Sequence, residues 1–232
     1  MDQNYIDWLY GLSAPMVALN KEYGASYTGP NLFPDREFVK MDDDWGIDSR
    51  ESLFECVFRM IDAGHAPALS QYYFLYDRLP QYKWLEYSQS KTDFQKVLLE
   101  MVEQTFTECG VGGIRAWDYS RMGYILRNGI TNKYITEQEA LWILYRMALR
   151  SQYYYKTWQQ YFAGHFFGYF YWKTLRDEPS LDVLRYNLSR AYQMQSMTEL
   201  QTDANSPCNR LPWFIDIEEL EKPESLMEYD WS

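Results

Sequence analysis

Apolar residues recur at helical spacing along most of the chain, and short polar stretches separate these runs. Four pairs typical of a capping box precede apolar runs: Asp48 and Glu51, Thr92 and Gln95, Thr136 and Glu139, and Thr157 and Gln160. The pattern predicts helices over about 15–22, 48–63, 67–79, 92–109, 114–128, 136–149, 157–172 and 180–197. Apolar and polar residues almost never alternate with period two. We therefore expect at most a minor β-hairpin, within residues 24–39.

Two of these predicted helices differ in how widely their apolar residues are spread. The helix after Thr136 is apolar on most sides, which predicts a central, buried position. The next helix carries one aromatic stripe over 158–172, which we interpret as core, with His165 as a hydrogen-bonded core residue. Gly164 and Gly168 lie one turn apart there and would let a neighbouring helix come close. We therefore predict an all-α, single-core irregular bundle of seven to eight helices, with little or no β structure.

The end of the chain differs from the rest, which predicts a helical domain over 1–204 and an acidic C-terminal extension over 205–232. Residues 216–232 hold seven acids and one base, and three prolines within the extension interrupt helices. The extension also keeps large apolar residues such as Trp213 and Trp231, which a purely solvating tail would lack. We expect it to dock either on its own domain or on a partner.

Composition excludes several classes of protein. The chain has 232 residues, which fits one domain, and its net charge of −11 makes nucleic acid an unsuitable partner because phosphates repel it. Three widely spaced cysteines indicate neither a disulfide framework nor a cysteine-based zinc site. The N-terminus lacks the basic region of a signal peptide, and there is no apolar run of 18 residues. We expect a cytoplasmic protein that does not enter membranes.

No common catalytic or nucleotide-binding motif occurs in the chain. It has neither a Walker A motif, nor a dinucleotide-binding glycine motif, nor His-Glu-x-x-His, and with two histidines it cannot form a multi-histidine metal site. We therefore expect neither a metal nor a cofactor. The glycine loop over 110–113, followed by Arg115, could cradle an anion at the start of a helix. We favour a plain helix connection, since the loop lacks the Lys-Ser/Thr ending.

The candidate chemistry gathers around Asp118, Arg121 and His65. Asp118 and Arg121 lie three residues apart on one predicted helix, beside Trp117, so a guanidinium could orient the carboxylate while His65 shuttles a proton. The same spacing forms an ordinary ion pair that ties a helix to its neighbours, and this structural interpretation is favoured. A histidine after Gly64 can equally serve to bond the last carbonyls of a helix.

Acidic residues beside aromatic ones suggest a surface for a protein partner. Three consecutive acids precede Trp45, without the alternating spacing of a calcium loop; they form either a solvated loop or a partner-facing patch. Aromatic residues supply interface hot spots, and flanking charge sets association rate and selectivity. The candidate partner-binding residues are Asp42, Asp43, Asp44, Trp45, Trp213, Glu218, Glu219, Glu221, Tyr229 and Trp231.

Several short motifs follow one another in a family-like order. They include Trp8–Pro15, Trp45–Glu51, Gly64-His65, Ala116–Arg121, Tyr134–Ala140, Trp158, Tyr161, Gly168 and Trp172. In order and spacing the chain resembles, over about residues 5–175, the bacterial family known as domain of unknown function 1266. It departs from the family pattern at Tyr119-Ser120, where Leu-Gly is expected, and at Ala66-Pro67, where a basic residue is usual. The resemblance implies a small, helical, bacterial cytoplasmic protein and implies no reaction.

Three functions remain open at this point. The first is a non-catalytic immunity protein, which neutralises a toxin domain encoded nearby by covering its active site with an acidic, aromatic-rich surface. The second is an enzyme whose pocket gathers His65, Asp118 and Arg121 and acts on a phosphorylated or nucleotide-like small molecule. The third is a generic interaction module. We favour the first because no catalytic set of residues is evident.

Overall fold

Helices make up the regular structure in the described part of the chain. The computed structural model describes residues 2–177, 180–191 and 194–228. Within these ranges it has no strand, and the β structure is one isolated bridge between Met41 and Ile47. The α-helices are α1 (Gln3–Gly11), α2 (Ala14–Leu19), α3 (Asp42–Trp45), α4 (Arg50–Ala63), α5 (Pro67–Arg78), α6 (Gln81–Gln89), α7 (Asp93–Cys109), α8 (Arg115–Thr131), α9 (Glu137–Tyr154), α10 (Trp158–Asp177), α11 (Leu181–Ala191), α12 (Gln195–Thr202) and α13 (Pro207–Arg210). Short 3₁₀ turns are η1 (Lys21–Tyr23), η2 (Gly110–Gly112) and η3 (Glu224–Leu226).

The all-α class is confirmed, although the described residues form more helices than expected. Eleven of the described α-helices have six residues or more, against the predicted seven to eight. The predicted helix over 180–197 is two helices, α11 and α12, and α1 and α6 were not predicted. Of the side chains in α6, Trp84 is buried while most of the others are exposed, so the helix has little apolar periodicity to reveal it.

Side chains close to the helix starts explain several boundaries. Thr92 and Thr136 each accept a hydrogen bond from the backbone three residues later, and the side chain there bonds back, as the capping boxes predict. At α4 the prediction is wrong by one residue, because Ser49 and not Asp48 is the cap, and Ser52 closes the box.

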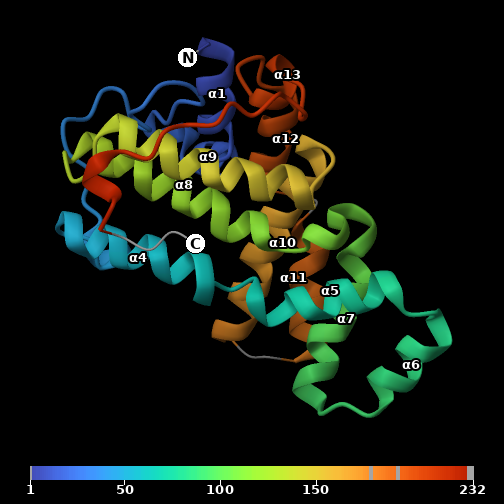
Figure 1. Ribbon diagram of the computed structural model, residues 1–232. Coiled ribbons are helices and arrows are strands. Elements are labelled where there is room, and N and C mark those ends of the chain that lie inside the picture. Colours follow the sequence, from blue (N-terminus) through green and yellow to red (C-terminus); the bar gives the residue numbers. More distant parts are fainter. Residues whose placement is uncertain (1, 178–179, 192–193, 229–232) are drawn as a thin grey trace.

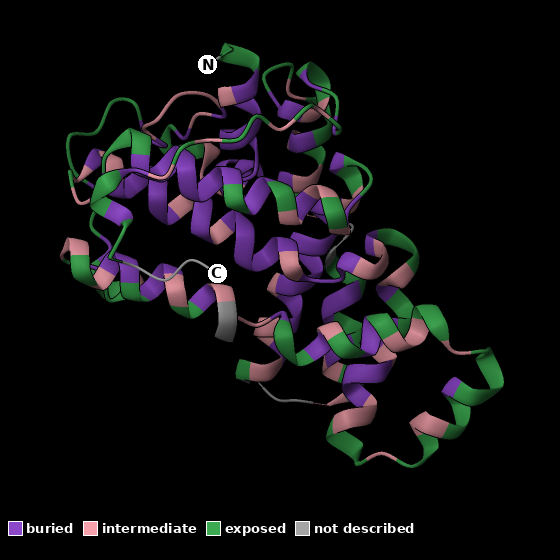
Figure 2. Ribbon diagram, in the orientation of Figure 1, coloured by how far each residue is buried: buried purple, intermediate pink, exposed green. Residues whose placement is uncertain are grey.

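The buried hydrophobic residues form two clusters, which corrects the expectation of a single core. The first cluster joins α1, α2, α4, α8, α9 and the first half of α10. The second joins α5, α6, α7, α11 and the second half of α10. Figure 1 shows the corresponding two groups of helices, with α10 running from one to the other. Figure 2 shows α8 and α9 buried over much of their length, whereas α6 is largely exposed.

Glycines on α10 allow α8 to start in close contact with it, as predicted. A Cβ atom at Gly168 would collide with the Cβ of Trp117, and one at Gly164 would collide with the backbone carbonyl of Gly113. The aromatic stripe is core over its first half, where Tyr161, Phe162 and His165 are fully buried. This contact fixes the end of α8 that carries the candidate site.

The described part of the C-terminal extension lies on the helical domain and follows α9 (Figure 1). Gln152, near the end of α9, donates to the backbone carbonyls of Trp213 and Ile215. Ser225 donates to Glu139 at the start of the same helix, at 2.6 Å. Two of these contacts bind the backbone of the extension and the third binds the Ser225 side chain, so the extension is held near both ends of α9.

Glu139 ties α4, α9 and the extension together, which makes its contribution to stability depend on pH. Burial alone would raise the pKa of this carboxyl, but hydrogen bonds from Arg50, Ser225 and Thr136 outweigh burial and lower it from 4.5 to about 2. A depressed carboxyl pKa stabilises the fold above pH 4.5, and this stabilisation is lost as the pH falls toward 2. We expect Glu139→Gln to be less stable than wild type near neutral pH, with the difference shrinking across that window.

Urea unfolding of both proteins at a series of pH values measures this difference. Glu219→Gln is the control, because Glu219 is exposed on the extension and its change should show no such trend. A difference for Glu139→Gln that stays constant from neutral pH down to pH 2 would contradict the assignment.

No helix in the described part of the chain combines the length and the apolar character that crossing a membrane requires.

Candidate functional site

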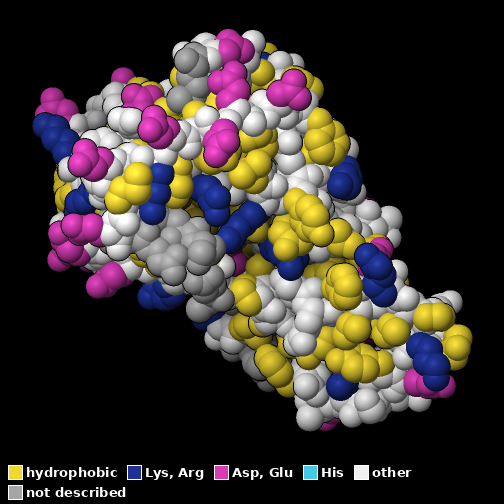
Figure 3. All heavy atoms as spheres, in the orientation of Figure 1, with side chains coloured by type: hydrophobic (Ala, Val, Ile, Leu, Met, Phe, Trp, Pro, Cys, Tyr) yellow, Lys and Arg dark blue, Asp and Glu magenta, His cyan; other side chains and the backbone are white. Residues whose placement is uncertain are grey.

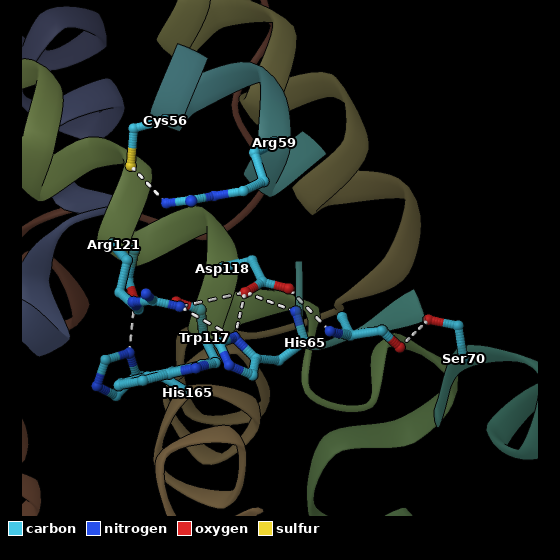
Figure 4. A network of polar contacts seen from close by, with 10 residues as sticks. Cys56, Arg59, His65, Ser70, Trp117, Asp118, Arg121 and His165 are labelled. Carbon is cyan, nitrogen blue, oxygen red and sulfur yellow. Dashed lines mark hydrogen bonds and ion pairs between the residues drawn. The ribbon is translucent and has the colours of Figure 1, made fainter. Parts of the chain in front are cut away.

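The three candidate catalytic residues meet at one place, between the two clusters. Asp118 and Arg121 lie on α8, and His65 lies in the loop between α4 and α5 (Figure 4). The Arg121 Nη1 atom is 3.1 Å from His65 Nδ1, and Asp118 Oδ1 is 3.5 Å from each of these two nitrogens. We call these three residues the Asp118 network.

The carboxylate of Asp118 is engaged by the backbone of the loop before α5. Its oxygens accept hydrogen bonds from the backbone N–H of His65 at 3.2 Å and of Ala66 at 2.8 Å. Ala66 is the N-cap of α5 and Pro67 follows it, so Asp118 places a negative charge at the positive end of that helix. The Asp118 side chain is 2% exposed. Asp118 thus caps a helix from a distant part of the chain.

Gly64 makes this contact possible. A Cβ atom at this position would collide with the carboxylate of Asp118 and with the backbone carbonyl of Met60. The backbone of Gly64 has a φ of −67°, which any residue adopts, so the glycine is required by the approach of Asp118 and not by a left-handed conformation. Gly64 therefore both ends α4 and admits the Asp118 carboxylate.

Arg121 is held between two tryptophan rings and the Asp118 carboxylate. Its guanidinium lies 5.0 Å from the ring centre of Trp45 and 4.7 Å from that of Trp117. Burial lowers the pKa of Arg121, and the charge of Asp118 acts against that shift. Trp45 also packs on Tyr124, with ring centres 5.6 Å apart. Trp45 is therefore half-buried and packs on its own domain, and its part in binding a partner stays a prediction.

The two histidines have different surroundings. His65 is 30% exposed, and its Nε2 atom bonds to none of the described residues. His165 is fully buried, its Nδ1 atom bonds to Ser120, and burial and the nearby charge of Arg121 lower its pKa to about 3. His165 is thus a neutral core residue, as predicted, and His65 is the imidazole of the pair that faces solvent.

The Asp118 network offers limited chemistry. Its carboxylate is occupied by two backbone donors and a guanidinium, and the Nδ1 atom of His65 is within bonding distance of Arg121. Within the described part of the chain, no three His, Cys, Asp or Glu side chains are placed to hold a metal ion. What remains accessible is the Nε2 side of His65 and the edge of Arg121, which is 16% exposed.

The predicted acidic residues lie at the surface in two groups. Asp42, Asp43 and Asp44, which we call the α3 acids, are exposed, and Lys40 pairs with Asp43 at 2.8 Å and with Asp42 at 3.9 Å. The extension acids, which are Glu218, Glu219 and Glu221, are also exposed. Neither Asp44 nor any of the extension acids forms an ion pair with a described residue.

Of the aromatic residues of the extension that were predicted to bind a partner, the structure describes Trp213, which is buried. Trp213 is 6% exposed, donates its indole N–H to the Tyr155 carbonyl at 2.8 Å, and packs on Trp158 at 4.8 Å between ring centres. It therefore cannot act as an exposed anchor, and the prediction for this residue is wrong because its apolar surface is used in the core. Tyr229 and Trp231 lie outside the described residues. The neighbour Phe214 is the exposed aromatic residue here, at 55%.

Sequence comparison places the chain among bacterial relatives. Residues 40–213 match the model of a family described as "Protein of unknown function (DUF1266)". The chain is 38% identical to "Uncharacterized protein YbeR" of Escherichia coli K12 over 190 residues, which is 82% of this chain and 80% of the relative. It is 31% identical to "Uncharacterized protein YbeU" of the same organism over 211 residues, 88% of each chain.

No solved structure shows significant similarity to the chain. The family match extends beyond residue 175, the end of the resemblance found in the motifs, to Trp213, and so includes α11, α12 and α13. The Asp118 network and the buried tryptophan of the extension both lie inside it. The chain belongs to the DUF1266 family.

Proposed function

We propose that the protein acts by binding another protein, most concretely as an immunity protein that covers the active site of a toxin domain encoded nearby. The observation that carries the proposal is the exposure of the α3 acids and the extension acids on a chain with a net charge of −11. In Figure 3, Asp and Glu side chains spread over the upper part of the visible face, which belongs to the larger group of helices.

Exposed carboxylates without counter-charges favour a basic partner. Asp44 and the extension acids have no ion pair with described residues that would offset their negative charge. An active site that holds nucleic acid or a nucleotide is basic, so docking would offset this charge and steer the encounter. The association should be fast at low salt and should slow as salt screens the charges.

The structural use of the Asp118 network also supports a role without catalysis. The carboxylate that a general base would need accepts two backbone N–H groups and caps α5. Its removal would disturb the fold before it disturbed any reaction, which is typical of a residue that holds helices together.

The test is to co-express the protein with the product of the neighbouring gene and to measure both growth and binding. We expect the wild type to protect growth and to bind the purified toxin domain. A variant with all α3 acids and extension acids changed to Asn or Gln should associate at least about tenfold more slowly at low salt. The matched control changes Asp93 and Asp182 to Asn, two fully exposed acids elsewhere, and should associate like the wild type.

The proposal fails if the neighbouring product is no toxin, or if it binds the neutralised variant as fast as the wild type. Binding to a partner that is not a toxin, with the same dependence on the acids, would indicate the generic interaction module instead.

The convergence of His65, Asp118 and Arg121 favours one alternative, an enzyme acting on a phosphorylated or nucleotide-like small molecule. In that case Arg121 would bind the phosphate and the exposed Nε2 of His65 would transfer a proton. Purified protein incubated with p-nitrophenyl phosphate and with nucleotides tests this directly. Turnover by the wild type that is abolished in His65→Gln would establish the alternative, and equal background rates in both proteins would remove it.

A further inference from the structure

A groove lies where the two groups of helices meet, on the side of α5 and the end of α9. It has a volume of about 820 Å³ and is lined by α5, Val111 of η2, Arg115 at the start of α8, and the 153–156 segment. None of these residues belongs to the Asp118 network, to the α3 acids or to the extension acids. The groove is therefore separate from the site described above.

The groove is positively charged although the chain is strongly negative. Arg78, Arg115 and Lys156 line it, together with one acid, Asp77. Asp77 pairs with Arg78 at 3.3 Å, whereas Arg115 and Lys156 form no ion pair with any described residue. Figure 3 shows Lys and Arg side chains across the middle of the visible face, between its acid-rich upper part and its lower part, where hydrophobic side chains gather.

Arg115 is fixed in place by contacts that leave its charge uncompensated. Its Nη1 atom donates to the backbone carbonyls of Val111 and Gly112, at 3.2 and 3.1 Å, and its guanidinium lies 4.0 Å from the ring centre of Tyr154. Carbonyl groups and an aromatic ring orient a guanidinium without neutralising it. Arg115 therefore presents a positioned positive charge at the edge of the groove.

The groove also exposes large aromatic surface. Phe74 is 56% exposed and Tyr153 is 74% exposed, and they come from two different helices, α5 and α9. Aromatic side chains exposed beside arginine are the residues that most often dominate protein interfaces.

We propose that this groove binds an acidic peptide segment of a partner protein, with apolar or aromatic residues between its carboxylates. The carboxylates would lie against Arg115 and Lys156, and the apolar residues against Phe74 and Tyr153. A peptide fits better than a small anion, because the glycine loop beside the groove does not cradle phosphate. Instead Gly112 and Gly113 make room for the rings of Tyr155 and Tyr73, into which added Cβ atoms would collide.

The experiment selects peptides from an unbiased display library on the immobilised full-length protein. We expect enrichment of peptides in which Asp or Glu alternates with Phe, Tyr, Trp or Leu. The best peptide, labelled with a fluorophore, should bind with an affinity that falls as salt increases. Lys156→Glu and Tyr153→Ala should each weaken its binding by about tenfold or more.

Matched control variants test whether peptide binding depends on the groove or only on the general charge and hydrophobicity of the protein. Lys83→Glu and Tyr186→Ala change exposed residues of the same types on α6 and α11, and should leave affinity within about twofold. The variant that lacks the α3 acids and the extension acids should bind the peptide as the wild type does. A failure of the groove proposal can therefore be distinguished from a failure of the proposed function.

Two results would overturn the proposal. One is the absence of acidic enrichment, or equal enrichment on Lys156→Glu. The other is displacement of the peptide by ADP or inorganic phosphate that itself binds the wild type and not Lys156→Glu, which would make the groove a site for small anions.

Discussion

Changing Asp118 to alanine should lower the free energy of unfolding by about 3–5 kcal/mol, as the loss of one partner from a buried ionic group does. The substitution leaves the backbone N–H groups of His65 and Ala66 without their acceptor. It also removes the negative charge 3.5 Å from Arg121, whose side chain is 16% exposed and sits between two tryptophan rings. Urea unfolding followed by circular dichroism measures the change.

Asp182→Ala is the matched control for this prediction. Asp182 is also an aspartate of a helix, but its side chain is 98% exposed and its ion pair with Arg185 is at 4.0 Å. Its loss should change stability by no more than about 0.5 kcal/mol. If both variants lose the same small amount, Asp118 does not hold α5 to α8, and the structural interpretation of the network is wrong.

Trp213→Ala should be comparably destabilising, by about 3–5 kcal/mol, because a large aromatic side chain leaves a buried site. The indole packs against Trp8 and Trp158, with ring centres 5.4 and 4.8 Å away, and bonds to the Tyr155 carbonyl. Because the extension is anchored through this residue, limited proteolysis should also cleave the chain after about residue 205 faster in the variant. Thermal unfolding and a proteolysis time course measure both effects.

The next residue in the chain supplies the control. Phe214 is also aromatic and lies in the same segment, but it is 55% exposed. Phe214→Ala should leave the unfolding free energy within about 0.5 kcal/mol of wild type and the cleavage rate unchanged. Equal destabilisation by the two substitutions would show that the extension is not anchored by the burial of Trp213.

Local signals in the sequence predicted most helix starts, because a capping box involves residues three apart. Thr92 and Thr136 cap the helices that they precede for this reason. Glycines were less informative. The helix predicted over 114–128 is longer in the structure, since α8 continues through Gly129 to Thr131, and Gly129 serves to admit the side chain of Leu53. A contact between residues that are far apart in the chain does not alter the spacing of apolar residues near Gly129, so the local sequence does not reveal it.

The sequence predicted which residues form the site, but it predicted the roles of these residues less well. Asp118, Arg121 and His65 do come together, but nothing in the sequence indicates that the Asp118 carboxylate caps a helix that begins 51 residues earlier, at Pro67. Trp213 was misassigned because it follows Pro212 and lies just before the acidic stretch that begins at Asp216, a context typical of exposed chain. The groove was missed because its cations come from α5, from α8 and from the segment that follows α9, which only the fold brings together.

The central claim is that the exposed acids bind a partner while the Asp118 network is structural. Growth protection against the neighbouring gene product tests it most directly, by comparing two variants whose folding is first verified by circular dichroism. His65→Ala, which removes the accessible imidazole, should protect as well as the wild type, whereas neutralising the α3 acids and the extension acids should weaken protection. Full protection by the neutralised variant, together with loss of protection in His65→Ala, would contradict the claim.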